Sequence, residues 1–316
     1  MGAGQDGGTQ LSRRRFLTTA TATAAAVGAA PGVALAHGGR GHGHGGHRHD
    51  RIPRERISIQ LYTLRDQLAI DLPGTLQALS DIGYERVEHA GFVGRTVTQF
   101  KAELDAAGLR ATSGHVSIPQ PFDAAAWNAS LQDALTLRSK YIVQPFFGIN
   151  FGTGAVVRDS ATWAAFARDL NTAGQMARRV GLRLGYHNHN WEFFRLTDDP
   201  SRRAFDVLVE ETDPRYVHFE LDLFWSWRGA NDPVDTLRRI DGRVRQYHVK
   251  DLNQAGSFAD VGDGLIDFVR IFREQAADEY IVERDDAGTP PRTPAQALDT
   301  ARVSYEYLAN LSLRRR

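Results

Sequence analysis

The sequence predicts a (β/α)8 TIM barrel, a fold of the α/β class in which eight parallel strands alternate with helices. Short β-type runs alternate with amphipathic helical stretches from Arg56 onward. This body has about 260 residues, and ~250 is typical of the fold. A doubly wound open sheet is the main alternative. It usually carries a glycine-rich loop after its first strand, and "QLYTLRD" (60–66) contains no glycine.

Eight runs have the length and composition of strands, and their starts recur at the spacing of a βα unit. They are expected at residues 57–62, 85–90, 110–117, 141–147, 182–189, 217–224, 244–252 and 279–285. Helices are expected between them, with apolar residues at i, i+3, i+4 and i+7. The clearest places on one stripe Trp163, Phe166, Leu170, Ala173, Ala177 and Val180. Gly181 ends that helix, and Gly83 and Gly108 end two earlier ones.

Residues 1–36 have the pattern of a cleavable export signal. "SRRRFL" (12–17) precedes an apolar stretch rich in Ala and Thr that ends in "ALA" (34–36). The paired arginines followed by Phe and Leu resemble a twin-arginine signal, so we expect a periplasmic or secreted protein. A retained membrane anchor is the alternative, but Gly28, Pro31 and several threonines make the stretch a poor membrane-spanning helix.

Residues 37–55 are expected to form a disordered leader rich in Gly and His, and residues 56–316 the barrel. Five of the eleven histidines lie in "HGGRGHGHGGHRHD" (37–50), which lacks the apolar residues that could offset the entropy of ordering. A passive linker is favoured, with weak metal scavenging as the alternative. The chain has no cysteine, so disulfides and thiolate metal sites are excluded.

The overall charge is balanced, with 38 basic and 38 acidic side chains. This balance gives no reason to expect a nucleic acid or, after signal cleavage, a membrane as partner. A small-molecule sugar or glycoside is the expected partner, and the sequence does not indicate an oligomeric state.

Polar side chains gather at the ends of the predicted strands. In chain order they are Gln60, Glu88, His89, His115, Gln144, His187, His189, Glu192, His218, Glu220, Asp222, His248, Lys250 and Glu283. Chance placement would scatter some of the histidines over the helices. Because chemistry in TIM barrels takes place at the carboxyl ends of the strands, this concentration predicts an active site there.

Alternation along the sixth strand indicates which residues face the barrel axis. His218, Glu220 and Asp222 alternate with apolar residues, so the polar side chains point inward and the apolar ones toward the helices. Such a polar ladder is costly unless its members bind each other, water or an ion. Carboxylates that converge with the imidazole of His248 form an oxygen-rich site, which suits Mn²⁺, Mg²⁺ or Co²⁺ better than a structural zinc.

Several segments, in this order and spacing, resemble the xylose isomerase-like TIM barrels. This sugar phosphate isomerase/epimerase superfamily also includes keto-inositol dehydratases and some sugar lyases. The segments are "YHNHNWEF", "ELDLFW" with "GANDP", "YHVKD", "VGDGLIDF" and "YIVERDD", and the similarity covers residues 56–312.

The resemblance implies a divalent cation, preferably Mn²⁺, with Mg²⁺ or Co²⁺ as alternatives. Its ligands would be Glu192, Asp222, His248 and Glu283. The two glutamates would also act as acid and base on opposite sides of a substrate carbon. A metal ion acidifies the C–H bond next to a carbonyl, and Lys250 could add to the stabilisation of the oxyanion.

One position departs from the pattern of the isomerases. Family members that isomerise or epimerise commonly carry a histidine three residues after the sixth-strand aspartate, where this chain has Trp225. An indole is a stacking surface and cannot serve as a base or a ligand. "YHNH" together with "LDLFW" is more similar to the branch of lyases and hydratases that act on 3-keto-sugars or 3-keto-glycosides. In that reaction His187, His189 or His115 would protonate the leaving group.

Three hypotheses for the function follow. The first is a metal-dependent isomerase or epimerase that abstracts a proton next to the carbonyl of a non-phosphorylated sugar, since no glycine-rich loop or arginine cluster is present for a phosphate. The second is a lyase or hydratase of keto-sugars, and the third a non-catalytic extracytoplasmic protein that binds sugar or metal. Substrate contacts are expected from Gln60, Glu88, His115 and Trp225.

Overall fold

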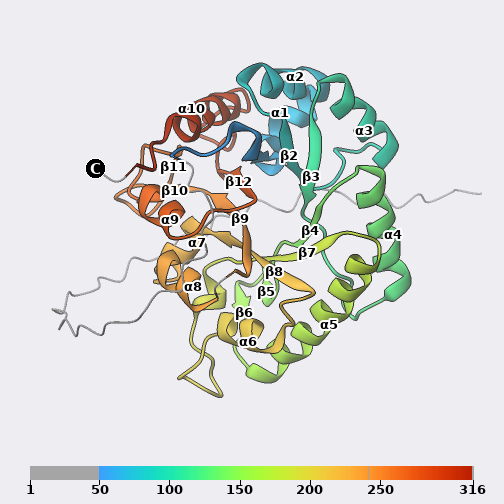
Figure 1. The fold of residues 1–316 in the computed structure, drawn as a ribbon, viewed down its shortest axis with the longest axis vertical. Helices are drawn as coiled ribbons and strands as arrows, with labels where there is room; N and C mark the ends of the chain where they lie inside the picture. Colours follow the sequence, from blue (N-terminus) through green and yellow to red (C-terminus); the bar gives the residue numbers. More distant parts are fainter. Residues whose placement is uncertain (1–49, 241, 315–316) are drawn as a thin grey trace, which may run out of the picture. The chain divides into compact units, whose positions relative to one another are not determined.

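The computed structural model describes residues 50–240 and 242–314. Its central feature is an eight-stranded parallel sheet surrounded by helices (Figure 1). The strands are β1 (Ile57–Gln60), β2 (Arg86–His89), β3 (Arg110–Gly114), β4 (Tyr141–Gln144), β7 (Arg183–His187), β8 (Val217–Asp222), β9 (Val244–Val249) and β12 (Glu279–Val282). The predicted TIM barrel is confirmed. Each strand ends before its predicted run does, because the last residues leave the sheet to form the mouth of the barrel.

The sheet closes almost completely. The strand order is β3-β2-β1-β12-β9-β8-β7-β4, so β3 and β4 are its two edges. These edges meet through a parallel bridge between His115 and Val143, and the Val116 N–H donates to the Val143 carbonyl at 2.8 Å. Closure brings the carboxyl ends of all eight strands to one rim.

Ten helices of the described residues connect the strands: α1 (Arg65–Ile70), α2 (Leu72–Ile82), α3 (Val97–Ala106), α4 (Ala124–Thr136), α5 (Ser160–Arg179), α6 (Ala204–Glu211), α7 (Leu223–Arg228), α8 (Pro233–Arg239), α9 (Phe268–Glu274) and α10 (Gln296–Asn310). Three 3₁₀ helices complete the set: η1 (Arg54–Arg56), η2 (Leu61–Leu64) and η3 (Trp191–Phe193). Aspartate side chains cap six of the helices, at Asp71, Asp123, Asp159, Asp222, Asp232 and Asp267. Among the described residues, no helix combines the length and apolar character needed to cross a membrane.

Two short antiparallel hairpins follow strand ends and were not predicted. β5 (Ile149–Asn150) pairs with β6 (Ala155–Val156) after β4, and β10 (Asp251–Leu252) pairs with β11 (Phe258–Ala259) after β9. Strands of two residues are too short to show an alternating pattern.

Helix α5 packs on the barrel through the predicted stripe. Trp163, Phe166 and Leu170 are buried, and Gly181 follows the helix in a left-handed conformation (φ +85°). Gly174 lies on the same buried face, where a Cβ would stand only 2.6 Å from the Tyr216 carbonyl oxygen. The absence of a side chain at this position therefore sets how closely α5 approaches the start of β8.

We expect Gly174→Ala to destabilise the protein, although alanine normally favours a helix by about 1 kcal/mol over glycine. The contact with rigid backbone forces a shift that costs about 1–3 kcal/mol. Urea unfolding measures the change, and Thr172→Ala, on the exposed face of the same helix, is the matched control. A Gly174→Ala protein more stable than the wild type would show that α5 can shift away from the Tyr216 carbonyl at little cost in free energy.

A buried polar network fills the amino-terminal end of the barrel. The Thr112 hydroxyl donates to Glu279 Oε1 at 2.5 Å, and the Gln246 amide donates to Glu279 Oε2 at 3.5 Å. His218 Nε2 lies 3.1 Å from Gln246 Oε1. His218, expected near the mouth, thus lies one layer below Glu220, because β8 begins at Val217. Burial raises the pKa of Glu279 to about 7.

This raised pKa predicts that the free energy of unfolding falls with pH. The folded protein binds the Glu279 proton more tightly than the unfolded chain, whose carboxyl has a pKa near 4.5. The contribution is complete below pH 4.5 and is lost as pH rises through 7, a change of about 3 kcal/mol. Urea unfolding at pH 5 and pH 8 should show a smaller loss in Glu279→Gln than in the wild type. Equal losses would contradict the assignment.

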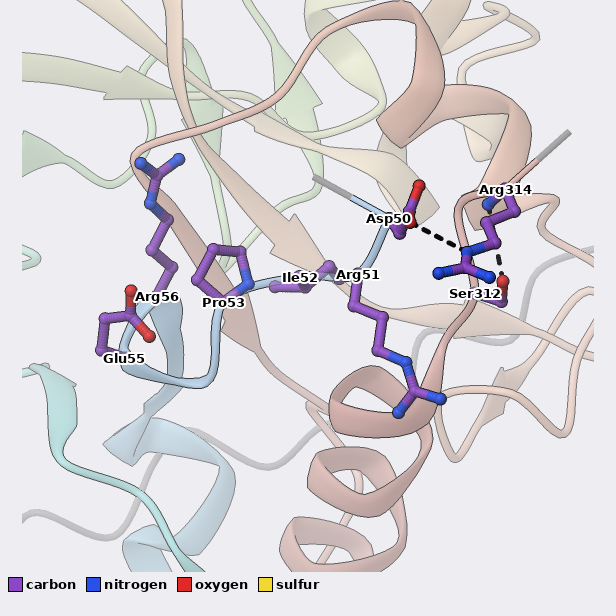
Figure 2. Close-up of a pocket in the computed structure, with 8 residues that line it drawn as sticks. All are labelled: Asp50, Arg51, Ile52, Pro53, Glu55, Arg56, Ser312 and Arg314. Carbon is purple, nitrogen blue, oxygen red and sulfur yellow. Dashed lines mark hydrogen bonds and ion pairs between the residues drawn. The ribbon is translucent and has the colours of Figure 1, made fainter. Parts of the chain in front are cut away.

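Residues 50–56, at the end of the predicted leader, pack on the barrel. Arg51 forms an antiparallel bridge with Ser312, and Ile52 is buried. A cavity here is lined by Asp50, Arg51, Ile52, Pro53, Glu55, Arg56, Ser312 and Arg314, and a dashed line in Figure 2 joins Arg314 to Asp50 at one end of it. None of the predicted site residues lines this cavity. The predicted export signal and residues 37–49 of the leader lie outside the described residues.

Candidate active site

The carboxyl ends of neighbouring strands bring several of the predicted site residues together. Asp222 ends β8, His248 lies near the end of β9, Glu283 follows β12 and His187 ends β7. One donor atom from each of these four side chains lies within 4.8 Å of the others, and all four are buried. The alternation that points Asp222 and His248 inward also pairs them directly in the β8–β9 register.

The local fold fixes two of these donors. Asp222 caps α7, where its Oδ1 accepts the Trp225 N–H at 2.7 Å. Its other oxygen, Oδ2, is buried and accepts no hydrogen bond within the described residues. His248 Nδ1 lies 2.7 Å from Glu283 Oε2. An imidazole nitrogen and two carboxylates therefore converge.

Lys250 supplies a positive charge to the same group. Its Nζ lies 2.6 Å from Glu283 Oε2, 3.2 Å from Asp222 Oδ2 and 3.0 Å from Asp285 Oδ1, and the side chain is 2% exposed. Burial alone would lower the pKa of Lys250, but Asp222, Asp285 and Glu283 outweigh it and raise that pKa well above its ordinary value. The ammonium group thus keeps its charge inside the barrel.

Glu192 lies outside this group of four donors. It is on η3, where its Oε1 accepts the Tyr186 hydroxyl at 2.7 Å and its Oε2 accepts the His189 N–H at 2.8 Å. Burial raises the pKa of Glu192 to about 8, against the effect of these hydrogen bonds. The structure therefore gathers Asp222, His248 and Glu283 from the predicted ligand set, and adds His187 where Glu192 was expected.

His187 and His189 are both neutral bases. Burial and the neighbouring His248 hold the pKa of His187 well below its ordinary value, and burial with His187 does the same for His189. The His189 ring stacks on Trp191, with ring centres 4.3 Å apart, and its Nδ1 is buried without a partner. An unpartnered imidazole nitrogen at the mouth is available to exchange a proton with a bound molecule.

A second layer of polar side chains lies directly beneath. Glu88 accepts the Gln60 amide at 2.7 Å and the Ser113 hydroxyl at 2.5 Å. His115 Nε2 lies 2.9 Å from Glu220 Oε1 and 3.2 Å from Glu88 Oε1. The Gln60 side chain also accepts the Tyr62 N–H. Gln60 and Glu88, expected to contact substrate, are instead fully buried and bound to one another.

The pKa values of the two carboxylates in this layer are shifted in opposite directions. Burial and the negative charge of Glu220 raise the pKa of Glu88. Burial would also raise the pKa of Glu220, but His248 and hydrogen bonds from His115 and His187 outweigh it and hold that pKa well below its usual range. Glu220 is therefore ionised beneath the predicted metal ligands.

Trp225 lies beside the mouth on α7. Its ring centre is 5.4 Å from that of His189 and 5.7 Å from Lys250 Nζ. The indole Nε1 is buried and has no partner in the described part of the chain. Trp225 thus offers a ring face and one unused N–H donor to the site, a combination that suits a hydroxylated ring.

The donors present fit a divalent cation. Carboxylates from Asp222 and Glu283 with an imidazole from His248 form the oxygen-rich set that Mn²⁺ and Mg²⁺ accept. Asp222 Oδ2 pairs with the Lys250 ammonium at 3.2 Å, and a carboxylate oxygen has a second lone pair that a cation can take. His248 Nε2 lies 2.7 Å from Glu88 Oε1, the outer carboxylate contact that orients metal-binding histidines.

Comparison with known proteins decides the family. A family model described as "xylose isomerase-like TIM barrel" matches residues 76–304. The chain belongs to this family. Among curated members, an inosose dehydratase from Geobacillus kaustophilus is 29% identical over 173 residues, covering 47% of this chain and 53% of the relative. An inosose dehydratase from Clostridium tetani is 27% identical over 136 residues, covering 37% and 44%. The chain thus spans about half the length of the curated relatives it matches.

Solved structures share the fold of this chain. A sugar phosphate isomerase/epimerase from Parabacteroides distasonis has a TM-score of 0.70 and 24% identity, covering 83% of this chain and 96% of the other. A probable 3-DHS dehydratase from Bacillus anthracis has a TM-score of 0.61 and 14% identity, covering 81% and 99%. These likenesses confirm the barrel over most of its length.

Proposed function

We propose that the chain is a metal-dependent lyase or dehydratase acting on a keto-sugar. The observation that carries the proposal is the convergence of Asp222, His248, Glu283 and the Lys250 ammonium at one end of the barrel. Asp222, His248 and Glu283 would hold the ion. Bound there, a divalent cation would polarise the substrate carbonyl and make the adjacent C–H bond acidic.

The chain's own residues can carry the proton transfers. Burial would raise the pKa of the Glu283 carboxyl, but the Lys250 and His248 charges hold that pKa well below its usual range, so the Glu283 carboxylate would take the proton from the carbon next to the carbonyl. The electron pair would then form a C=C bond as the C–O bond on the next carbon breaks. Glu192, whose carboxyl has a pKa raised to about 8 by burial and so carries a proton near neutral pH, would give that proton to the leaving oxygen, so that water or an alcohol departs neutral. The neutral His189 would accept a hydrogen bond from a substrate hydroxyl through its unpartnered Nδ1. Lys250 would stabilise the negative charge that develops on the carbonyl oxygen.

Two further observations favour elimination over isomerisation. Trp225 occupies the place after Asp222 where a second proton-transfer group would be needed, and its indole cannot provide one. The curated relatives are inosose dehydratases, and an inosose is a neutral keto-sugar. A non-phosphorylated substrate also fits a site whose lysine, Lys250, is already paired with carboxylates.

An assay in deuterated water separates the alternatives. The protein with Mn²⁺ is incubated with a keto-inositol, a 3-keto-glycoside and a simple ketose. Loss of water or release of the aglycone supports the proposal. Deuterium uptake by the ketose without any elimination favours isomerisation instead. Binding of sugar and metal with neither reaction would leave a non-catalytic binding protein.

We also propose that the chain acts after export by the twin-arginine route. The proposal depends on "SRRRFL", outside the described residues. Arg13→Lys together with Arg14→Lys should retain the protein in the cytoplasm, as measured by cell fractionation with immunoblotting. Unchanged export would exclude this route.

A further inference from the structure

A second group of metal donors lies beneath Asp222 and Glu283, and we propose that it binds a second transition-metal ion. The group consists of His115, His187, Glu220 and His248, whose donor atoms lie within 4.8 Å of one another. The number of ions that the chain binds does not depend on the reaction, so this proposal stands apart from the proposed function.

Three imidazole nitrogens surround one carboxylate oxygen in this group. Glu220 Oε1 lies 2.9 Å from His115 Nε2, 3.1 Å from His187 Nδ1 and 2.9 Å from His248 Nε2. Donors bound at about 2.0–2.2 Å to one zinc or cobalt ion stand about 3 Å apart. The distances to Glu220 Oε1 fit N–H···O hydrogen bonds as well as a set of ligands.

The ring nitrogens of His248 and His187 would allow an upper and a lower ion to bind without using the same nitrogen atom. His248 points Nδ1 to Glu283, at 2.7 Å, and Nε2 to the lower layer. His187 points Nδ1 to Glu220, and its Nε2 lies 3.7 Å from Asp222 Oδ2. His248 can thus bind the upper ion through Nδ1 while its Nε2–H donates to Glu88. His187 binds the lower ion through Nδ1, and its Nε2 keeps its hydrogen.

The second oxygen of Glu220 points independently to a ligand. Oε2 is buried and has no hydrogen-bond partner in the described part of the chain, and the residue is 0% exposed. A buried carboxylate oxygen without a partner is costly. A cation bound by Glu220 would use both of its oxygens.

The nitrogen and oxygen donors of the lower site indicate which metal ions it would bind. Two imidazoles and one carboxylate, His115, His187 and Glu220, are the set that Fe²⁺, Co²⁺ and Zn²⁺ accept with open positions. The oxygen-rich upper set suits Mn²⁺ or Mg²⁺. The His115 side chain is 12% exposed, so an ion can reach the lower layer from the mouth.

The test measures metal content by equilibrium dialysis of the full chain against Co²⁺ followed by elemental analysis. We expect Glu220→Gln and, separately, His115→Gln to bind one ion fewer per chain than the wild type. Asp222→Asn should also bind one fewer, and the double variant Asp222→Asn with Glu220→Gln two fewer. Any binding by the histidine-rich leader is the same in all variants and cancels. The visible absorption of the Co²⁺-loaded wild type minus that of the Co²⁺-loaded Glu220→Gln variant gives the spectrum of the ion at the lower site. We expect this difference spectrum to be that of Co²⁺ with nitrogen ligands and a low coordination number.

Two outcomes would overturn the proposal. If Glu220→Gln and His115→Gln bind as many ions as the wild type, a protonated imidazole fills the lower layer. If the double variant loses only one ion, both layers serve a single site. Circular dichroism in EDTA verifies that each variant is folded, and His115→Gln, at a partly exposed position, keeps the test decisive if Glu220→Gln does not fold.

Discussion

Replacing Glu283 with glutamine is expected to lower kcat by about 10²–10⁴-fold, the range that general acid–base groups contribute. Glutamine keeps the size of the side chain but removes the charge that faces His248 and Lys250 at 2.7 and 2.6 Å. The variant would lose a candidate base and weaken the hold on a divalent ion. The measurement is the elimination assay with saturating Mn²⁺, supported by the affinity for Mn²⁺.

The chain offers a matched control on the same strand. Glu279 begins β12 and is also buried, but it faces the amino-terminal end of the barrel. Glu279→Gln should keep kcat within about threefold of the wild type, a change below 1 kcal/mol in the barrier. If both substitutions lower kcat equally, the loss reflects the barrel interior in general and not the site at the mouth.

Asp251 holds the loop that carries the "VGDGLIDF" segment. Its carboxylate is buried and accepts four backbone N–H groups: Leu252 and Ile266 on Oδ1, and Gly262 and Gly264 on Oδ2, at 2.8 to 3.1 Å. A Cβ at Gly264 would stand 2.2 Å from Asp251 Oδ1, so only glycine allows this approach. The two glycines of the segment thus let the loop wrap around one side chain next to Lys250.

Asp251→Ala is therefore expected to lower the free energy of unfolding by about 3 kcal/mol or more, since it leaves several backbone N–H groups without an acceptor. Urea unfolding measures the loss. Asp263→Ala, at an exposed position in the same loop, should change it by less than about 0.5 kcal/mol. Similar effects of the two substitutions would mean that the loop is held by other contacts.

The strands of the barrel could be predicted from the sequence because strand and helix periods alternate clearly. Runs such as "VHFELDLF" show period two, and the stripe through Trp163 and Phe166 shows the helical period. The hairpins β5–β6 and β10–β11 could not be predicted, since each strand has two residues. The role of Asp251 could not be predicted either, because three of its four partners lie 11 to 15 residues further along the chain.

The sequence indicated which residues lie near the mouth of the barrel, but it did not indicate how deep each one lies. Strand-end position correctly indicated that Asp222, His248, Lys250 and Glu283 lie close together. Strand-end position did not distinguish these residues from Glu88, Glu220 and Gln60, which lie one layer deeper in the barrel. The depth of a side chain depends on how far each strand is shifted relative to its neighbours, which residue type does not show. His89 also ends a strand, yet it packs against Phe92 and Phe100 outside the barrel interior, since neighbouring residues of a strand face opposite sides.

The barrel is expected to open locally at the seam between β3 and β4. Elsewhere the strands share ladders of at least three registered pairs, but here a bridge at His115 and Val143 joins the edges. Local opening is easiest where main-chain pairing is sparsest. Amide hydrogen exchange should thus be faster at residues 112–116 than in β8 or β9. Transient parting of this seam would give solvent a lateral route to His115.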